Sequence, residues 1–235
     1  MTNINRRRFL KGGSATLITS FALPSLAASN TTADTAEDVG RGGKYQLQFF
    51  SDSDFEIVEA IIDQLIPGDE LSPAASELGV AEFIDSELAG PYGQATHWYM
   101  QGPFEPGLPT QGYQTRRTPG QLIKDGIHAV ESVVQADYQT RSFTALPSEQ
   151  QVELLERIEQ GERELPGLDG TLFFKHLLAL TKQGFFSDPM HGGNKHMAAW
   201  KMIGFPGARS SFYEWKDNTD KPYSIAPVAI KGVKS

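Results

Sequence analysis

Apolar residues recur three or four positions apart in five separate segments, and this spacing constrains the fold more than any other feature of the sequence. The segments lie near residues 53–66, 80–89, 119–138, 148–160 and 169–183. Such spacing places the apolar side chains of a segment on one face of an α-helix. No stretch alternates apolar and polar residues between hairpin turns, as a half-buried strand does. The sequence therefore predicts a small, irregular all-α domain.

Local signals mark the ends of these helices. The capping-box pattern, in which Ser or Thr precedes Glu or Gln by three residues, begins at Ser53, Thr118 and Ser148. In this pattern two side chains satisfy backbone N–H groups that the first helical turn leaves unpaired. Pro67-Gly68 and Gly161 follow two of the segments and favour a helix stop. We expect helices to begin at the three capping residues.

Residues 90–120 interrupt the helical pattern. Eleven of these 31 residues are Gly or Pro, and aromatic residues such as Trp98, Phe104 and Tyr113 stand among them. The segment is too aromatic for a disordered linker and too interrupted for a helix. Loops of this length and composition are usually functional or held against another surface. We therefore expect a loop insertion rich in Gly, Pro and aromatic residues, whose aromatic side chains are candidates for contact with a partner.

The amino terminus carries a twin-arginine export pattern. Arg6 and Arg7 form the pair, and Phe9, Leu10 and Lys11 follow it. The weakly apolar stretch that comes next is too short and too polar to span a bilayer, and small residues before position 28 suit cleavage by a signal peptidase. We expect residues 1–27 to be a signal peptide read by the twin-arginine translocase, with a periplasmic product. The alternative is a basic amphipathic arm.

Composition narrows the classes of function. The chain has no Cys, which excludes disulfides, iron–sulfur clusters and covalently attached haem c in this chain. Removing residues 1–27 takes away four of 21 basic residues and none of the 29 acidic ones, which leaves a net charge of −12. Nucleic acid is an unsuitable partner for so acidic a chain. No later apolar run spans a membrane, so we expect any membrane association to be indirect.

No cofactor motif accompanies the export signal. The sequence contains no Gly-rich turn for a dinucleotide, no nucleophile elbow and no P-loop. The twin-arginine route moves proteins that are already folded, typically around a cofactor. A cofactor carried by a second protein that travels with this chain would reconcile the two observations.

Three histidines are conceivable metal ligands. His176, His191 and His196 do not form the i, i+3 or i, i+4 pairs typical of a helical zinc site. His176 lies on an apolar helical face, where we expect a core histidine. The acidic residues, Asp188 included, form no evident acid–base pair. We therefore predict no catalytic, cofactor-binding or metal-binding residues in this chain.

A block near the carboxyl terminus shows a family resemblance. Residues 188–194 read Asp-Pro-Met-His-Gly-Gly-Asn, and residues 200–207 read Trp-Lys-Met-Ile-Gly-Phe-Pro-Gly. Together they resemble the hallmark of the gluconate 2-dehydrogenase subunit 3 family. His191 stands where Tyr is usual, and Lys195-His196 replaces the common Arg-Asp. Likeness at residues 66–67, 79–85, 102–104 and 111–114 extends the resemblance to about residues 50–210.

The resemblance implies a protein complex. Its large subunit oxidises gluconate with FAD, and a multihaem cytochrome c subunit, which holds haem c, passes the electrons on. The small, or gamma, subunit is non-catalytic and supports folding, stability and export of the flavoprotein. The same role in a fructose, glucose or other polyol dehydrogenase is a second hypothesis. A free-standing periplasmic metal-dependent enzyme is a third, and an export chaperone that releases its client is a fourth.

The hallmark residues have two interpretations each. Either they build a rigid turn and a core anchor, or they contact the partner. In the first interpretation Asn194 caps a helix over residues 195–203, and Trp200 anchors that helix. The interface candidates in this block are Asp188, Pro189, His191, Gly192, Gly193, Asn194, Trp200, Gly204, Phe205, Pro206 and Gly207.

The expected organisation has four parts. The signal peptide is followed by a flexible leader at residues 28–50 and by the helical domain at residues 51–210. Residues 211–235 are apolar but interrupted by Pro, which suits an extended carboxyl-terminal arm. The arm lies either in a groove of the large subunit or on its own domain.

Overall fold

The computed structural model describes residues 45–105, 107–108, 110–217, 221, 223 and 225–230. The chain divides into two compact units, residues 1–46 and 47–235, and only the second is described over most of its length. The predicted signal peptide lies outside the described residues, as does the predicted leader up to residue 44. Within the described part, no helix has the length and apolar character that crossing a membrane requires.

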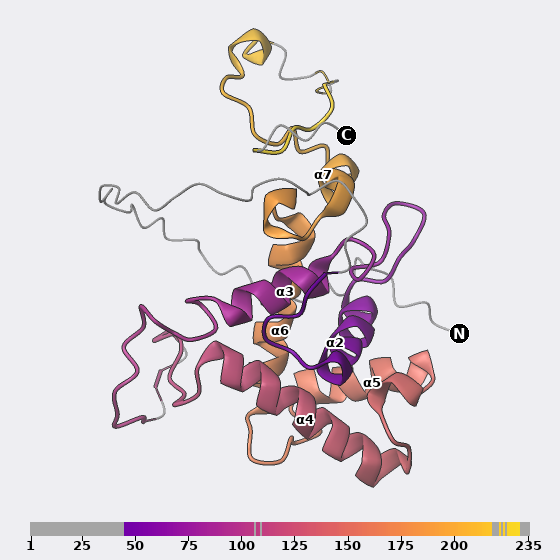
Figure 1. The fold of residues 1–235 in the computed structure, drawn as a ribbon, viewed down its shortest axis with the longest axis vertical. Helices are drawn as coiled ribbons and strands as arrows, with labels where there is room; N and C mark the ends of the chain where they lie inside the picture. Colours follow the sequence, from indigo (N-terminus) through magenta and orange to yellow (C-terminus); the bar gives the residue numbers. More distant parts are fainter. Residues whose placement is uncertain are drawn as a thin grey trace. The chain divides into compact units, whose positions relative to one another are not determined.

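The second unit is all-α, as predicted (Figure 1). Its main helices are α2 (Asp52–Leu65), α3 (Val80–Ala89), α4 (Pro119–Tyr138), α5 (Ser148–Glu159) and α6 (Gly170–Phe186). The short helix α7 (Ala198–Ile203) follows, and single 3₁₀ turns occur at Phe143–Ala145, Pro189–His191, Lys195–Met197 and Tyr213–Trp215. Two isolated β-bridges are the only strand-like pairings in the described residues.

Helix α6 forms the centre of the core, because it packs against α2, α3, α4 and α5. Phe173, Leu180 and Phe185 of this helix are almost completely buried. The close α4–α6 contact depends on Gly126, since a Cβ there would overlap the ring of Phe173. Burial of large apolar side chains of this kind contributes about 1.5–3 kcal/mol each to folding.

One of the three predicted capping boxes forms as expected, and two do not. Thr118 and Gln121 cap each other's backbone N–H groups at the start of α4. Helix α2 begins earlier than predicted, because the Oγ of Ser51, not that of Ser53, accepts from the backbone N–H of Asp54. Ser148 does not cap α5; its hydroxyl donates to the side chain of Gln64 on α2 at 3.0 Å. A contact between helices has replaced the local cap.

Residues 48–50, which fall in the predicted leader, are tied to α3. The fully buried carboxylate of Asp85 accepts hydrogen bonds from the backbone N–H groups of Gln48, Phe49 and Phe50, at 2.7, 3.0 and 2.8 Å. A carboxylate surrounded by backbone donors is a strong, directional anchor. The segment before α2 is therefore part of the helical domain.

Candidate partner-binding surface

The first part of the hallmark block lies in the hallmark turn, residues 187–197, which connects α6 to α7. Asp188 begins the block, and its Oδ1 accepts from the backbone N–H of Met190 at 3.0 Å. Gly192 has a φ of +97°, a conformation that glycine adopts without strain. The turn then runs back along α6 before α7 begins.

The glycine pair lets this turn approach the domain itself. A Cβ on Gly193 would overlap the backbone oxygen of Gly184 on α6. A Cβ on Gly79, next to α3, would lie 2.5 Å from the backbone oxygen of Gly192. The backbone N–H of Lys195 also donates to the oxygen of Leu78 at 3.1 Å. These contacts bring the backbone of the turn against α6 and against the start of α3.

Asn194 holds the turn from within. Its side chain is wholly buried; Nδ2 donates to the oxygen of Ser187 at 2.9 Å, and Oδ1 accepts from the N–H of Ala199 at 3.0 Å. The predicted continuous helix over residues 195–203 is wrong, because His196 and Met197 have φ values of 59° and 53°. These left-handed residues break the helix, so α7 starts at Ala198 and receives its cap from the distant Asn194 side chain.

Lys195 and Trp200 also make contacts within the chain. Lys195 forms an ion pair of 2.8 Å with Glu82 on α3. The indole N–H of Trp200 donates to the oxygen of Phe186 at 2.8 Å, and its ring packs edge-on against Phe205. Trp200 is almost fully buried and packs in a cluster that includes Ala229. The side chain of Trp200 therefore packs as a core anchor, the first of its two interpretations.

The described part of the carboxyl-terminal arm returns to its own domain. Ala208 donates its N–H to the oxygen of Val228 at 2.7 Å, beside an isolated parallel bridge between Gly207 and Val228. The N–H of Ile230 donates to Oδ2 of Asp188 at 2.8 Å. A Cβ on Gly207 would overlap the oxygen of Val228, so this glycine permits the contact. Asp188 thus supports both the hallmark turn and the arm.

Exposed large apolar side chains gather on two segments. The aromatic-loop surface consists of Trp98, Tyr99, Phe104 and Leu108. The carboxyl-terminal surface consists of Met190, Ile203, Phe205, Phe212, Tyr213, Ile225 and Ile230. Among the described residues, Leu71 is the only exposed large apolar residue outside them. Exposed large apolar residues concentrated on a few segments are consistent with protein-interaction sites.

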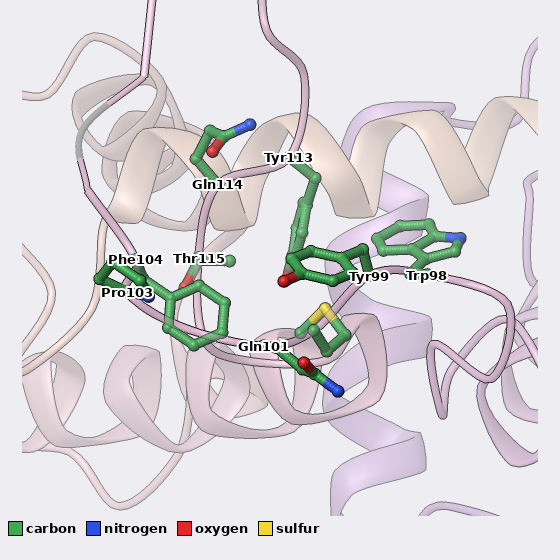
Figure 2. A pocket seen from close by; sticks show the side chains of 9 residues that line it. Trp98, Tyr99, Gln101, Pro103, Phe104, Tyr113, Gln114 and Thr115 are labelled. Carbon is green, nitrogen blue, oxygen red and sulfur yellow. The ribbon is translucent and has the colours of Figure 1, made fainter.

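A shallow pocket of about 430 Å³ lies within the aromatic loop. Figure 2 shows Phe104 and Pro103 on one side of it and Tyr99 and Trp98 on the other. Tyr99 is more exposed than Trp98 or Phe104, with 82% of its surface open to solvent. Aromatic rings line the pocket together with Gln101, Gln114 and Thr115, so it offers both apolar contact and hydrogen-bonding groups.

A row of aromatic rings anchors this loop to α6. Edge-to-face contacts with ring centroids 5.0 Å apart join Trp98 to Tyr113 and Tyr113 to His176. The hydroxyl of Tyr113 donates to the oxygen of Arg117 at 2.7 Å. Burial raises the pKa of Tyr113 far above its usual range, and burial lowers the pKa of His176 below its ordinary value. His176 is half-buried here, against an aromatic ring.

The three candidate metal-binding histidines occupy different settings. His176 packs on the aromatic loop, whereas His191 and His196 are exposed in the hallmark turn. In the described part of the chain, no three His, Asp, Glu or Cys side chains lie close enough together to hold a metal ion.

The predicted interface residues therefore lie in two kinds of place. Gly193, Asn194 and Trp200 face the interior, while Phe205, Trp98 and Phe104 expose apolar surface. Sequence reasoning missed Asp85, although an acidic residue among Ala81, Ile84 and Leu88 on an apolar helix face was a visible signal. It also missed the exposed apolar residue Ile203.

Comparison with known proteins gave one match. The model of the family described as gluconate 2-dehydrogenase subunit 3 matches residues 52–207. That span contains α2 to α7, the aromatic loop and the hallmark turn. Neither the curated proteins nor the solved structures gave a match.

Proposed function

Because the chain belongs to the gluconate 2-dehydrogenase subunit 3 family, we propose that it is the non-catalytic small subunit of a periplasmic, FAD-dependent gluconate 2-dehydrogenase. Family membership implies a multi-subunit dehydrogenase complex. In the proposed complex, FAD belongs to the large subunit, and a cytochrome c subunit accepts the electrons. This chain would support the folding, stability and twin-arginine export of the flavoprotein.

The observation that carries the proposal is the placement of exposed apolar residues. Eleven of the twelve exposed large apolar residues in the described part belong to the aromatic-loop surface or the carboxyl-terminal surface. Both surfaces lie in, or directly after, the span matched by the family. Tyr and Trp are enriched among the residues that dominate binding energy at protein interfaces. A subunit that serves by docking needs such surfaces.

The export signal supports the same role. Arg6 and Arg7 begin a twin-arginine pattern, whereas the chain contains no dinucleotide-binding motif. A flavoprotein that acquires FAD in the cytoplasm and docks on this chain would leave with it through the translocase. The chain's own residues would then bind and orient the partner and take no part in hydride transfer.

A pull-down with matched variants tests the proposal. The chain, tagged after Ser235, is recovered from periplasmic and membrane fractions, and the visible spectrum of the eluate is recorded. Flavin and haem c bands with a larger co-eluting chain are expected for the unaltered protein. Tyr99→Ser should reduce co-elution, whereas Leu71→Ser should not, because Leu71 is similarly exposed but lies outside both surfaces. A colourless, solitary chain would contradict the proposal.

A further inference from the structure

The charge of the chain is divided unevenly along its length. Residues 45–188 contain eight Lys or Arg and 23 Asp or Glu, a net charge of −15. Residues 189–235 contain seven Lys or Arg and three Asp or Glu, a net charge of +4. The helical core is thus strongly acidic, and the segment after α6 is basic. Such asymmetry orients a charged protein in the field of another.

The basic segment coincides with the carboxyl-terminal surface. Lys201 lies in α7 next to the exposed Ile203. The ammonium group of Lys216 lies 4.6 Å from the ring centroid of Tyr213, whose surface is 73% exposed. Cations therefore flank the exposed apolar residues. A partner surface with an apolar centre and acidic residues around it would complement this arrangement.

From these observations we propose that the carboxyl-terminal surface docks on the large flavoprotein subunit at an apolar area surrounded by Asp and Glu carboxylates. The inference rests on the proposed function and adds the chemistry of the partner's surface. An acidic partner is repelled by the helical core and attracted by residues 189–235, so charge selects this end of the small subunit.

The fold favours a protein partner over a lipid surface. The exposed apolar residues come from separate short segments, held together by the Asp188–Ile230 and Ala208–Val228 hydrogen bonds. Peripheral membrane binding more commonly uses one amphipathic helix that presents a continuous apolar face. The carboxyl-terminal surface presents no such continuous helical face, which favours a protein partner.

Charge-reversal variants of the co-expressed complex test the inference. The dissociation constant of the purified complex is measured by dilution at 50 and 500 mM NaCl. For the unaltered complex, the added salt should weaken binding about tenfold. The double variant Lys201→Glu and Lys216→Glu should weaken binding about tenfold at low salt and lose most of the salt dependence. Circular dichroism of each variant checks that the chain is folded.

A matched control carries the same charge change on the acidic core. Lys124→Glu and Arg141→Glu alter two exposed cations, one on α4 and one just after it. Binding by this control should stay within about twofold of the unaltered complex. The inference is also supported if the Lys201→Glu and Lys216→Glu variant folds but does not co-purify with the large subunit, while the control complex forms.

Three results would overturn it. If the reversal variant binds with unaltered affinity and salt dependence, the surface has a different partner chemistry although the proposed function stands. If the unaltered chain sediments with phosphatidylglycerol vesicles in a manner that the reversal abolishes, the surface is a lipid site. If the unaltered chain alone forms a salt-sensitive dimer that the reversal dissociates, the occupant is a second copy. Absence of any unaltered complex overturns the proposed function itself.

Discussion

The side-chain oxygen of Asn194 accepts a hydrogen bond of 3.0 Å from the backbone N–H of Ala199, five residues further along the chain. The amide nitrogen of the same side chain donates to the oxygen of Ser187 at 2.9 Å. One buried amide therefore joins the end of α6 to the start of α7. Asn suits the position because it supplies both a donor and an acceptor and tolerates the left-handed φ of 49°.

We expect Asn194→Ala to lower the free energy of unfolding by about 2–4 kcal/mol, because it leaves the N–H of Ala199 and the oxygen of Ser187 unpaired in the interior. Asn194→Asp should also destabilise, since it sets a carboxylate oxygen against the carbonyl of Ser187. Urea unfolding measures both effects, with Gln183→Ala, on the exposed side of α6, as the control. Unaltered stability with loss of the partner would instead assign Asn194 to the interface.

Asp85 gives a second prediction about stability. Its carboxylate accepts three backbone N–H groups from residues 48–50 in a fully buried site. Asp85→Asn keeps one acceptor oxygen but turns an amide NH₂ toward at least one of these donors, so we expect a loss of about 1–3 kcal/mol. Hydrogen exchange of the amides of residues 48–50 should become faster. Glu87→Gln on the same helix is the control. If the amides of residues 48–50 exchange at the same rate in both variants, Asp85 does not anchor this segment.

His176 predicts a pH dependence of stability. Burial, with a smaller contribution from Lys175, lowers the pKa of His176 in the folded chain below its ordinary value of about 6.5. The unfolded chain therefore binds the proton more readily, and the free energy of unfolding falls as the pH drops from about 6.5 to the lowered value. His176→Gln should remove this part of the fall. Urea unfolding of both proteins at about pH 7.5 and about pH 5 gives the difference.

A conservative variant checks the His176 assignment. Lys175→Gln removes a neighbouring positive charge, so the pKa of His176 should rise toward its ordinary value and the acid-induced loss of stability should shrink. Equal pH dependence in the unaltered chain and in His176→Gln would show that other groups cause the fall.

The export hypothesis predicts that this chain and the flavoprotein subunit are exported together. Replacing Arg6 and Arg7 by Lys should leave both this chain and the flavoprotein in the cytoplasm, because the translocase reads the Arg pair. Cell fractionation and periplasmic dehydrogenase activity measure the result. Arg8→Lys, which preserves the pair, is the control. A normal amount of flavoprotein in the periplasm of the double variant would refute export by this chain.

Much of the helical fold was predictable because its signals are local. The start of α4 at Thr118 and Pro119 follows the sequence pattern, as do the ends of α2 and α3. Ser148 shows the limit of such signals, since its hydroxyl bonds to Gln64, 84 positions away. A pattern that spans four residues contains no information about a hydrogen-bond partner on another helix, such as Gln64.

The candidate surface was predictable only in part. The sequence placed aromatic residues in the loop and showed the hallmark. It did not distinguish Gly193 and Asn194 from Phe205, because all three were predicted as interface candidates. Packing separates them, because the first two are buried against α6 while Phe205 remains exposed. Residue type alone does not reveal which side of a turn faces the solvent.

The sequence by itself determined the five main helices, the position of the irregular loop and the family, because apolar spacing, Gly, Pro and the hallmark motif are readable within short segments. Only the tertiary structure decided that the hallmark glycines approach the chain's own helices and that the described part of the arm returns to Asp188. The bond between Asp188 and Ile230 joins residues 42 positions apart. Contacts of that separation form only when packed helices bring both ends together, so no local pattern encodes them.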